Sequence, residues 1–557
     1  MRSSVPQPIR NALLASVALP VLFGVTSHEA RAGYFVPGDI VVSSSTYVGS
    51  ASTVTIGQAL PGGGNAVANG SYPNVFNNAS VDSSFGITSP LYLNQYSIGG
   101  TTAAPIATPQ GAPLNLTALT GVVTSFSSKS EGALNLSPDG HNLTLVDYLA
   151  APNMLDVSNS NTRGIAEPGN YTANATARTI VNLNSAGTAT AVLPTNAYPG
   201  NNGRAAINVG GNYYLAGNAG NANGGPAVTA ANGIQYLNPA TATQTSGAFN
   251  TGKVGSYNAQ TNPNANTVDP GSASGKTYGQ EDKASKDDNY RGLTVYNNTL
   301  YTTKGSGSNG VNTVYQVGTA GTLPTSGAAM SILPGFPTSF ARSPTANFYP
   351  FGLWFANSTT LYVADEGSGS NSASVAAGSL TAGDLATASG DTMAGLEKWS
   401  LINGTWIEDY VLQNGLGLGT PYQVCGTTVG GDTGCYTAAT DGLRNITGVT
   451  NPDGTVTIFG ITSTISAGGD QGADPNRFVA ISDQLSSLTL PGSEQFTTLN
   501  TAQYGQVFRG VSEAPVPEPA SAALFASGLG LLGLVRRRRT RTGQAPSPDT
   551  RLTSSVT

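Results

Sequence analysis

The sequence predicts an all-β fold. The first observation is the stretch at residues 350–367, PFGLWFANSTTLYVADEG, in which two runs of alternating apolar residues flank a polar turn, as in a β-hairpin. The second is that hairpins of this kind recur at intervals that average about 76 residues. They begin at Gly132, Ala205, Gly292, Gly352 and Asn445, and a sixth repeat opens at Gly510 but stops after its first strand. Such an interval holds one four-stranded sheet with its loops, so the sequence predicts a β-propeller of about seven four-stranded blades.

We place this propeller at residues 33–513 and expect its two ends to share one blade. Residues 38–42 and 91–98 are strand candidates that lack an inner hairpin of their own. Residues 507–514 supply an inner strand but no outer ones. Sharing a blade would close the ring and leave no sheet edge open to other chains.

Residues 1–32 have the pattern of a secretory signal peptide. Arg2 and Arg10 precede an apolar run at residues 12–25, and small residues lead to a predicted cleavage point between Ala32 and Gly33. A membrane anchor is the weaker alternative, because about 14 apolar residues are fewer than the roughly 20 that span a bilayer. We therefore expect an N-terminal signal helix that directs the export of the mature domain that follows it.

The C-terminal region, residues 514–539, contains the most specific motif of the chain. A Val-Pro-Glu-Pro sequence precedes an apolar run at residues 520–535, ASAALFASGLGLLGLV, and an arginine cluster follows. The motif residues are Pro517, Glu518, Pro519, Arg536, Arg537, Arg538 and Arg539. This arrangement resembles the PEP-CTERM sorting signal of Gram-negative bacteria, a tag that has also been catalogued as an ice-binding protein C-terminal region. The resemblance implies that an exosortase, a membrane protease-transpeptidase, processes the chain.

The apolar run is also expected to be a transmembrane helix before processing. Sixteen helical residues are ~24 Å long, enough for a thin bilayer with help from flanking arginines. The arginine cluster should stay cytoplasmic, followed by a disordered tail at residues 540–557. The predicted localisation is an inner-membrane intermediate and then the cell surface or extracellular matrix.

The charge of the domain excludes one class of partner. Between residues 33 and 513 there are 15 Lys and Arg against 27 Asp and Glu, a net charge of −12. Nucleic acid binding needs a basic face, so we expect no nucleic acid partner. The many aromatic residues, 23 Tyr and 16 Phe, favour an ordered domain over a disordered one.

Cys425 and Cys435 are the only cysteines, and export favours a disulfide between them. His141 is the single histidine of the mature domain, which excludes a multi-histidine metal centre and argues against a Ser-His-Asp triad. No catalytic residue, metal site or cofactor is assigned. Paired carboxylates such as Asp365 and Glu366 leave Ca²⁺ binding or acid-base chemistry open as an alternative to solvated loop charges.

Four arginines give a more specific hypothesis, because each immediately precedes the inner strand of a repeat. They are Arg204, Arg291, Arg444 and Arg509. In a closed ring they would lie at similar height near one mouth of the central channel. They could then hold an anionic ligand such as an acidic sugar, or they could form ion pairs with the abundant carboxylates.

These observations predict a surface or matrix protein that binds or organises exopolysaccharide without catalysis. Whether the chain is an enzyme stays open, and a carboxylate-based hydrolase or lyase is the first alternative. A second alternative, ice binding or adhesion, rests on the catalogue name of the tail. The expected partners are the exosortase and matrix polysaccharide.

Overall fold

The computed structural model describes residues 34–518, apart from several internal stretches. The stretches outside the description are 51, 54, 59–66, 69–75, 78–85, 127, 157–176, 200, 220–229, 258–287, 307–309, 342, 344–345, 370–378 and 466–473. The predicted signal peptide, Pro519, the apolar run at 520–535, the arginine cluster and the tail at 540–557 also lie outside the described residues.

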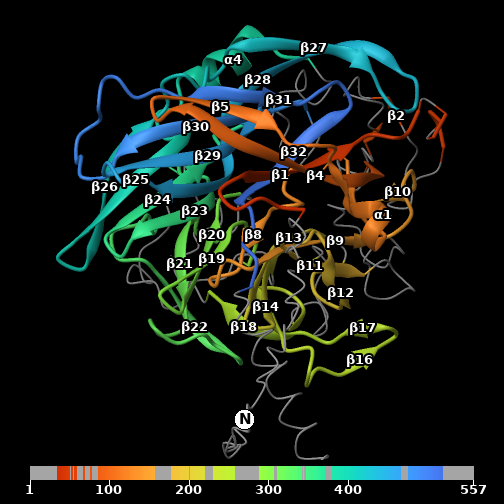
Figure 1. Ribbon diagram of the computed structural model, residues 1–557, viewed down its shortest axis with the longest axis horizontal. Coiled ribbons are helices and arrows are strands. Elements are labelled where there is room, and N and C mark those ends of the chain that lie inside the picture. The colour runs from red at the N-terminus through yellow and green to blue at the C-terminus, as the bar shows by residue number, and fades with distance from the viewer. Residues whose placement is uncertain are drawn as a thin grey trace, which may run out of the picture.

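Six antiparallel units of four strands make up most of the described chain (Figure 1). The first contains β32 (Gln506–Glu513), β1 (Ile40–Thr46), β4 (Gly86–Thr101) and β5 (Ala104–Pro109). The second contains β7 (Val122–Ser125), β9 (Asn142–Leu149), β11 (Arg178–Asn184) and β12 (Ala189–Thr195). The third contains β13 (Gly203–Val209), β14 (Asn212–Gly217), β15 (Ile234–Leu237) and β18 (Gly252–Ser256).

The other three units follow in chain order. The fourth contains β19 (Leu293–Tyr296), β20 (Thr299–Lys304), β21 (Thr313–Val317) and β22 (Ala328–Ile332). The fifth contains β23 (Pro350–Asn357), β24 (Thr360–Asp365), β25 (Gly395–Ile402) and β26 (Thr405–Leu412). The sixth contains β28 (Thr433–Thr450), β29 (Thr455–Thr464), β30 (Arg477–Gln484) and β31 (Thr497–Thr501), with β27 (Pro421–Thr427) paired to the start of β28.

Short elements complete the description. They are β2 (Val67–Ala68), β3 (Phe76–Asn77), β6 (Leu114–Asn115), β8 (Asn135–Leu136), β10 (Leu155–Asp156), β16 (Gln244–Thr245), β17 (Ala248–Phe249), α1 (Leu116–Thr120) and α4 (Ala382–Ser389). Within the described ranges, neither helix has the length and apolar character needed to cross a membrane.

The expectation of a seven-bladed propeller was wrong. The described strands form sheets of 13, 8, 5, 4 and 2 strands, not seven separate blades. Sheets merge because the 16-residue β4 pairs with β1 and β5 along one part and with β7 along another, and because β18 pairs in parallel with β22. The predicted number of blades was also too high, because the stretch at residues 47–85 contains only β2 and β3 at its described positions.

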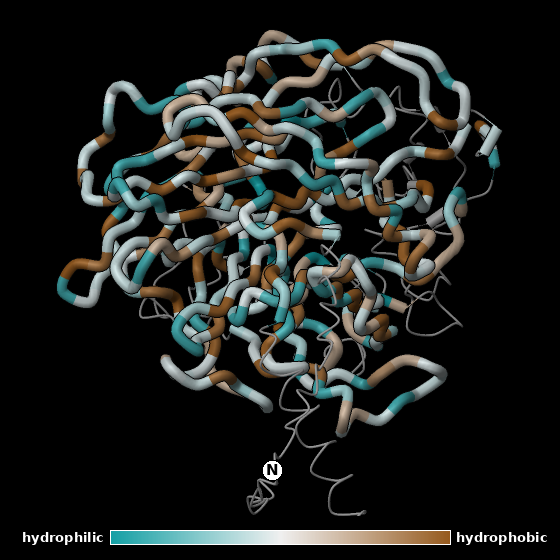
Figure 2. Tube along the Cα trace, in the orientation of Figure 1, coloured by the Kyte–Doolittle hydropathy of each residue, from teal (hydrophilic) through white to brown (hydrophobic). Residues whose placement is uncertain are grey.

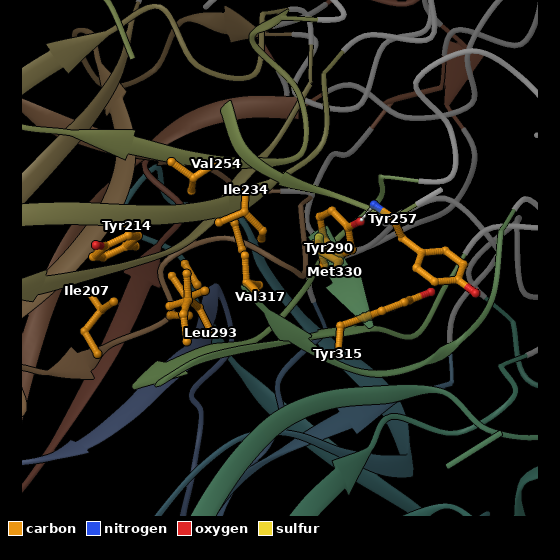
Figure 3. Packing of buried hydrophobic residues seen from close by; sticks show 14 of the residues in the cluster. Ile207, Tyr214, Ile234, Val254, Tyr257, Tyr290, Leu293, Tyr315, Val317 and Met330 are labelled. Atoms are coloured by element: carbon orange, nitrogen blue, oxygen red, sulfur yellow. Dashed lines mark hydrogen bonds between the residues drawn. The ribbon is translucent and has the colours of Figure 1, made fainter. Parts of the chain in front are cut away.

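The apolar core is divided among the boundaries between consecutive units. One cluster joins the third and fourth units, where Ile207 and Tyr214 meet Leu293 and Val317 (Figure 3). Similar clusters occupy the other boundaries, including one between the fifth and sixth units and one between the sixth and first. Figure 2 shows apolar and polar residues alternating along many of the strands, as expected for sheets with one face against a neighbour. The sheets are therefore held together by packing on both sides.

The first and last strands of the domain are neighbours. β1 pairs antiparallel with β32, from Ile40 opposite Glu513 to Thr46 opposite Gln506. β32 also packs against β28, whereas β28 packs against β23 and β13 packs against β9 and β19. The units thus follow one another round a shared buried centre (Figure 1).

Candidate functional site

Three of the four predicted arginines contact the end of β7 or the residues that follow it at this centre, whereas Arg291 lies beside Glu366. Arg509 donates to the carbonyl of Ser125 (3.0 Å) and Arg444 donates to the carbonyl of Lys129 (3.0 Å). The Arg204 Nε donates to the Ser130 hydroxyl (3.1 Å). All four arginines are at most 6% exposed.

Carboxylates accompany these arginines. Glu366 lies 3.2 Å from the Arg444 Nε and 4.0 Å from an Arg291 nitrogen, so one carboxylate serves two arginines. Buried Glu131 and Asp147 lie near Arg509. Burial lowers the pKa of this arginine, and the two carboxyl groups act in the opposite direction. The arginines are thus brought together, but each is engaged by the chain itself. An external anion would compete with these partners, and anion binding here stays a prediction.

Several buried carboxyl groups have raised pKa values because burial penalises their charged forms. The pKa of Asp441 rises to about 7 and that of Asp474 to about 6. The pKa of Asp365 also lies well above its ordinary value. No group of three or more His, Cys, Asp or Glu side chains within the described ranges is arranged to hold a metal ion. These carboxyls therefore offer buried polar contacts but no metal centre in that part of the chain.

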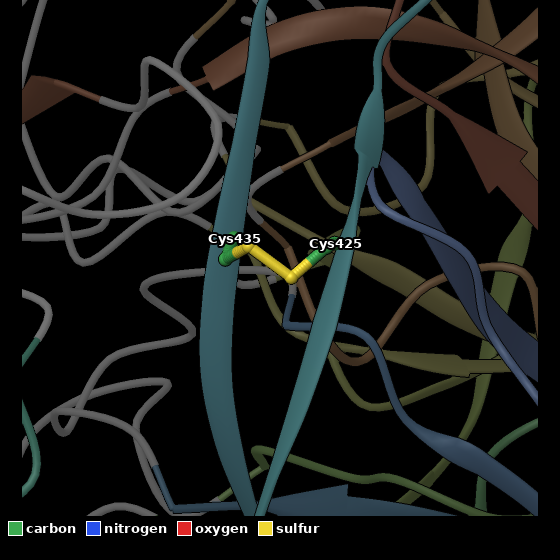
Figure 4. Close-up of a disulfide and its surroundings, with 2 residues drawn as sticks. All are labelled: Cys425 and Cys435. Atoms are coloured by element: carbon green, nitrogen blue, oxygen red, sulfur yellow. A yellow bond between two sulfur atoms is a disulfide. The ribbon is translucent and has the colours of Figure 1, made fainter.

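A disulfide-bonded hairpin stands over another part of the surface. β27 and the start of β28 pair from Pro421 to Thr427, and a disulfide joins Cys425 to Cys435, which lie opposite each other in this register (Figure 4). Side chains alternate along β27, so Cys425 is exposed whereas Tyr422 turns inward. The hairpin therefore has a solvent face that carries the disulfide and an inner face that covers the protein.

Tyr504 lies beneath this inner face, where two glycines make room for its ring. A Cβ atom at Gly426 would lie 3.1 Å from the Tyr504 Cβ, and one at Gly434 would lie 2.7 Å from the Tyr504 hydroxyl. A side chain at position 434 would therefore have to displace the end of the Tyr504 side chain, so glycine here permits the observed close approach.

A hollow of about 560 Å³ opens between the hairpin and β31. Its side walls are formed by Tyr422, Arg477, Thr501, Gln503 and Tyr504. The Arg477 Cζ lies 3.8 Å from the centre of the Tyr422 ring, a stacked cation-π contact. The Arg477 Nε is buried and has no hydrogen-bond partner among the described residues. We call this hollow the hairpin groove.

A second hollow, of about 290 Å³, adjoins the hairpin groove and shares Thr501 and Gln503 with it. Its wall is rich in amides. The amide side chains are Asn94, Gln95, Asn500, Gln503 and Gln506. Tyr96 contributes a hydroxyl that accepts a hydrogen bond from the Asn500 amide (2.9 Å). Together the two hollows form a continuous polar and aromatic surface, with one cation, beside the disulfide hairpin.

The C-terminal end of the described chain is tied to a turn of the domain. Val516 donates its backbone N–H to the Gly140 carbonyl (2.9 Å), and the His141 Nδ1 lies 2.9 Å from the Val516 carbonyl oxygen. Pro517 and Glu518 follow as exposed residues. His141 thus contacts the segment that leads out of the domain.

The family model of the PEP-CTERM protein-sorting motif matches residues 515–539. The chain carries a PEP-CTERM sorting motif. This confirms the resemblance drawn from Pro517, Glu518 and the arginine cluster, and identifies an exported protein that an exosortase sorts through the membrane to the cell surface. The motif covers only the C-terminal end, so it assigns the route of the protein and not the chemistry of the domain.

Comparisons of the whole chain add little to this. No curated protein matches the sequence. A putative glycosidase from Bacteroides thetaiotaomicron VPI-5482 is 9% identical and aligns over 58% of this chain and 93% of its own, with a TM-score of 0.20. A mutant of the Synechocystis apocarotenoid oxygenase is 8% identical over 83% of this chain and 74% of its own, also with a TM-score of 0.20. Likenesses this weak carry no argument about fold or activity.

Sequence reasoning did not find the hairpin groove. Tyr422, Arg477 and Tyr504 are far apart in the chain and belong to no motif. The nearest signal was the cysteine pair, because a disulfide between two residues so close in sequence indicates an exposed hairpin that the disulfide stabilises. Nothing in the sequence shows which residues such a hairpin covers.

Proposed function

We propose that this exosortase-sorted protein is a non-catalytic surface or matrix protein that binds an anionic polysaccharide in the hairpin groove. The observation that carries the proposal is Arg477, stacked on Tyr422 and lining a hollow beside Tyr504. A guanidinium group that lines a hollow can donate hydrogen bonds to a sugar carboxylate, sulfate or phosphate. Tyrosine rings offer apolar faces for sugar rings and hydroxyls for their polar groups.

The neighbouring amide wall supports a polymer rather than a single sugar. Asparagine and glutamine side chains both donate and accept hydrogen bonds, which suits sugar hydroxyls. The two hollows share Thr501 and Gln503, so an extended chain can occupy both. Neither lining includes a carboxylate or an imidazole among the described residues, so the surface offers binding contacts but no general acid-base pair there.

Substitution of Arg477 tests the proposal. The probe is a polyuronate such as alginate, with neutral dextran as the comparison, titrated by isothermal calorimetry into the domain. Arg477→Gln should weaken polyuronate binding roughly 10- to 100-fold, since hydrogen bonds to charged groups contribute about 1.5–3 kcal/mol. Thr437→Ala, on the solvent face of the same hairpin, is the matched control and should bind as the wild type does.

Two outcomes would contradict the proposal. Equal binding of alginate and dextran would show that charge is not recognised. Unchanged alginate binding by Arg477→Gln would show that the polymer binds elsewhere, and the central arginines would then be the next group to substitute.

A further inference from the structure

Lys398 and Asp483 meet at the buried boundary between two sheets. Lys398 lies on β25 and Asp483 on β30, and the Lys398 Nζ is 2.9 Å from the Asp483 Oδ2. Both side chains are 0% exposed. They lie among the apolar cluster of the fifth and sixth units, which includes Leu396 and Ile481. Burying two charges away from water is costly unless their attraction and their hydrogen bonds replace the lost hydration.

A second carboxyl group adjoins the pair. The Glu494 Oε1 accepts a hydrogen bond from the Gln484 backbone N–H (2.9 Å), next to Asp483 in the chain. Burial, and then the neighbouring Asp483, raise the pKa of Glu494 to about 8. The protein therefore favours the protonated form of Glu494, beside the Asp483 carboxyl group, more strongly than water does.

Hydroxyl groups complete the surroundings. The Tyr410 hydroxyl donates to the Asp483 Oδ1 (2.7 Å), and the Tyr362 hydroxyl donates to the Oδ2. Lys398 itself donates to the Tyr410 hydroxyl (2.9 Å) and to the Gln484 carbonyl (2.8 Å). The amine is thus held against a carboxyl oxygen of Asp483, with donors on both carboxyl oxygens.

We propose that Lys398 and Asp483 condense to form an intramolecular isopeptide bond that covalently joins β25 to β30. A proton passes from the Lys398 ammonium to the Asp483 carboxylate, which leaves a neutral amine and a neutral acid. The amine Nζ attacks the Asp483 Cγ, and the Cγ–O bond to the acid hydroxyl breaks. Glu494 gives its proton to the departing hydroxyl and receives the proton that Nζ loses. One water leaves, and nothing is oxidised or reduced.

The site contains what this step requires. Because the fold holds the amine and the carboxyl group in contact, no bimolecular encounter is needed, and this raises the rate by several orders of magnitude. The two tyrosine hydroxyls stabilise the negative charge that develops on the carboxyl oxygen. Exclusion of water from the cluster opposes hydrolysis of the amide. The bond would staple two sheets of a domain that works outside the cell.

The mass of the full-length chain tests this inference directly. After reduction of the Cys425–Cys435 disulfide, the wild type should be lighter than its sequence mass by one water, and a tryptic digest should contain a branched peptide that joins Lys398 to Asp483. Lys398→Met should have its full mass. Glu494→Gln retains both reacting groups and should also remain at full mass, or condense far more slowly. A folded wild type at full sequence mass would overturn the proposal and leave an ordinary buried ion pair.

A control distinguishes the isopeptide bond from another reaction that also releases one water. Asp453 precedes Gly454 in an exposed turn, and such a pair can cyclise to a succinimide with the same change in mass. A succinimide takes up water again in mild alkali, whereas an isopeptide does not. Loss of the mass difference after alkali, or its persistence in Lys398→Met, would contradict the proposed bond.

Discussion

Asp441 shows how one buried residue can make the stability of this domain depend on pH. It is 3% exposed, and its Oδ2 accepts a hydrogen bond from the Gly369 backbone N–H (2.9 Å). Burial raises its pKa to about 7, while nearby Lys129 acts in the opposite direction. The folded state thus holds a proton that the unfolded state releases near pH 4, so stability is full below pH 4 and is lost as pH rises toward 7.

Substitution of Asp441 should remove this dependence. We expect Asp441→Asn to be more stable than the wild type at pH 8, by on the order of 3 kcal/mol, and close to it at pH 4. Urea unfolding midpoints at the two pH values measure the difference. An equal change at both pH values would show that the effect is steric and not caused by titration.

At the scale of elements, the disulfide hairpin forms a wall of the hairpin groove but contributes little to the core. The described β27 pairs only with β28, and every second residue along it is exposed. The disulfide closes a short loop, so it stabilises the hairpin locally by about 2–3 kcal/mol. The hairpin is therefore expected to loosen on its own when the disulfide is lost.

Replacing both cysteines, as Cys425→Ser with Cys435→Ser, should leave the main thermal transition nearly unchanged and weaken polyuronate binding several-fold. Differential scanning calorimetry and the alginate titration measure the two effects. Dithiothreitol should weaken polyuronate binding by the wild type to the same extent, and it should leave binding by the double variant unchanged. A large fall in melting temperature would show that the hairpin supports the core, contrary to this account.

At the scale of the whole molecule, the domain is closed by its last strand. β32 pairs with β1 and supplies Arg509, which donates hydrogen bonds to the carbonyls of Ser125 and Phe126 at the end of β7. It also contributes Phe508 and Val511 to the cluster between the sixth and first units. Removal of β32 would expose the edge of β1 and uncouple the centre from the outer sheets.

Truncation tests this role of β32. A chain that ends after Ala514 should unfold in one cooperative transition like the full domain, because it keeps every described strand and loses, among the described residues, only 515–518. A chain that ends after Gly505 should melt at a much lower temperature or fail to fold. Circular dichroism on heating compares the two, and equal melting temperatures would contradict the closure.

The sequence predicted local elements better than their assembly. The hairpin at residues 350–367 is present as β23 and β24, because its alternation and its turn are both local signals. The number of sheets was wrong because long loops lengthen the interval between hairpins without adding strands. The central arginines were chosen because they recur at one position of the repeat, although the structure places Arg204, Arg444 and Arg509 within strands and not before them. In contrast, Tyr422, Arg477 and Tyr504 meet only because a hairpin folds over β31.

The most direct test of the proposed function uses one polymer in two charge states. Exopolysaccharide from the producing bacterium is titrated into the domain before and after its carboxyl groups are reduced to alcohols, which removes charge while preserving the chain. We predict binding to the native polymer that weakens with salt, and a loss of at least 10-fold after reduction. Equal binding to the native and the reduced polymer would contradict recognition of an anionic polysaccharide by Arg477.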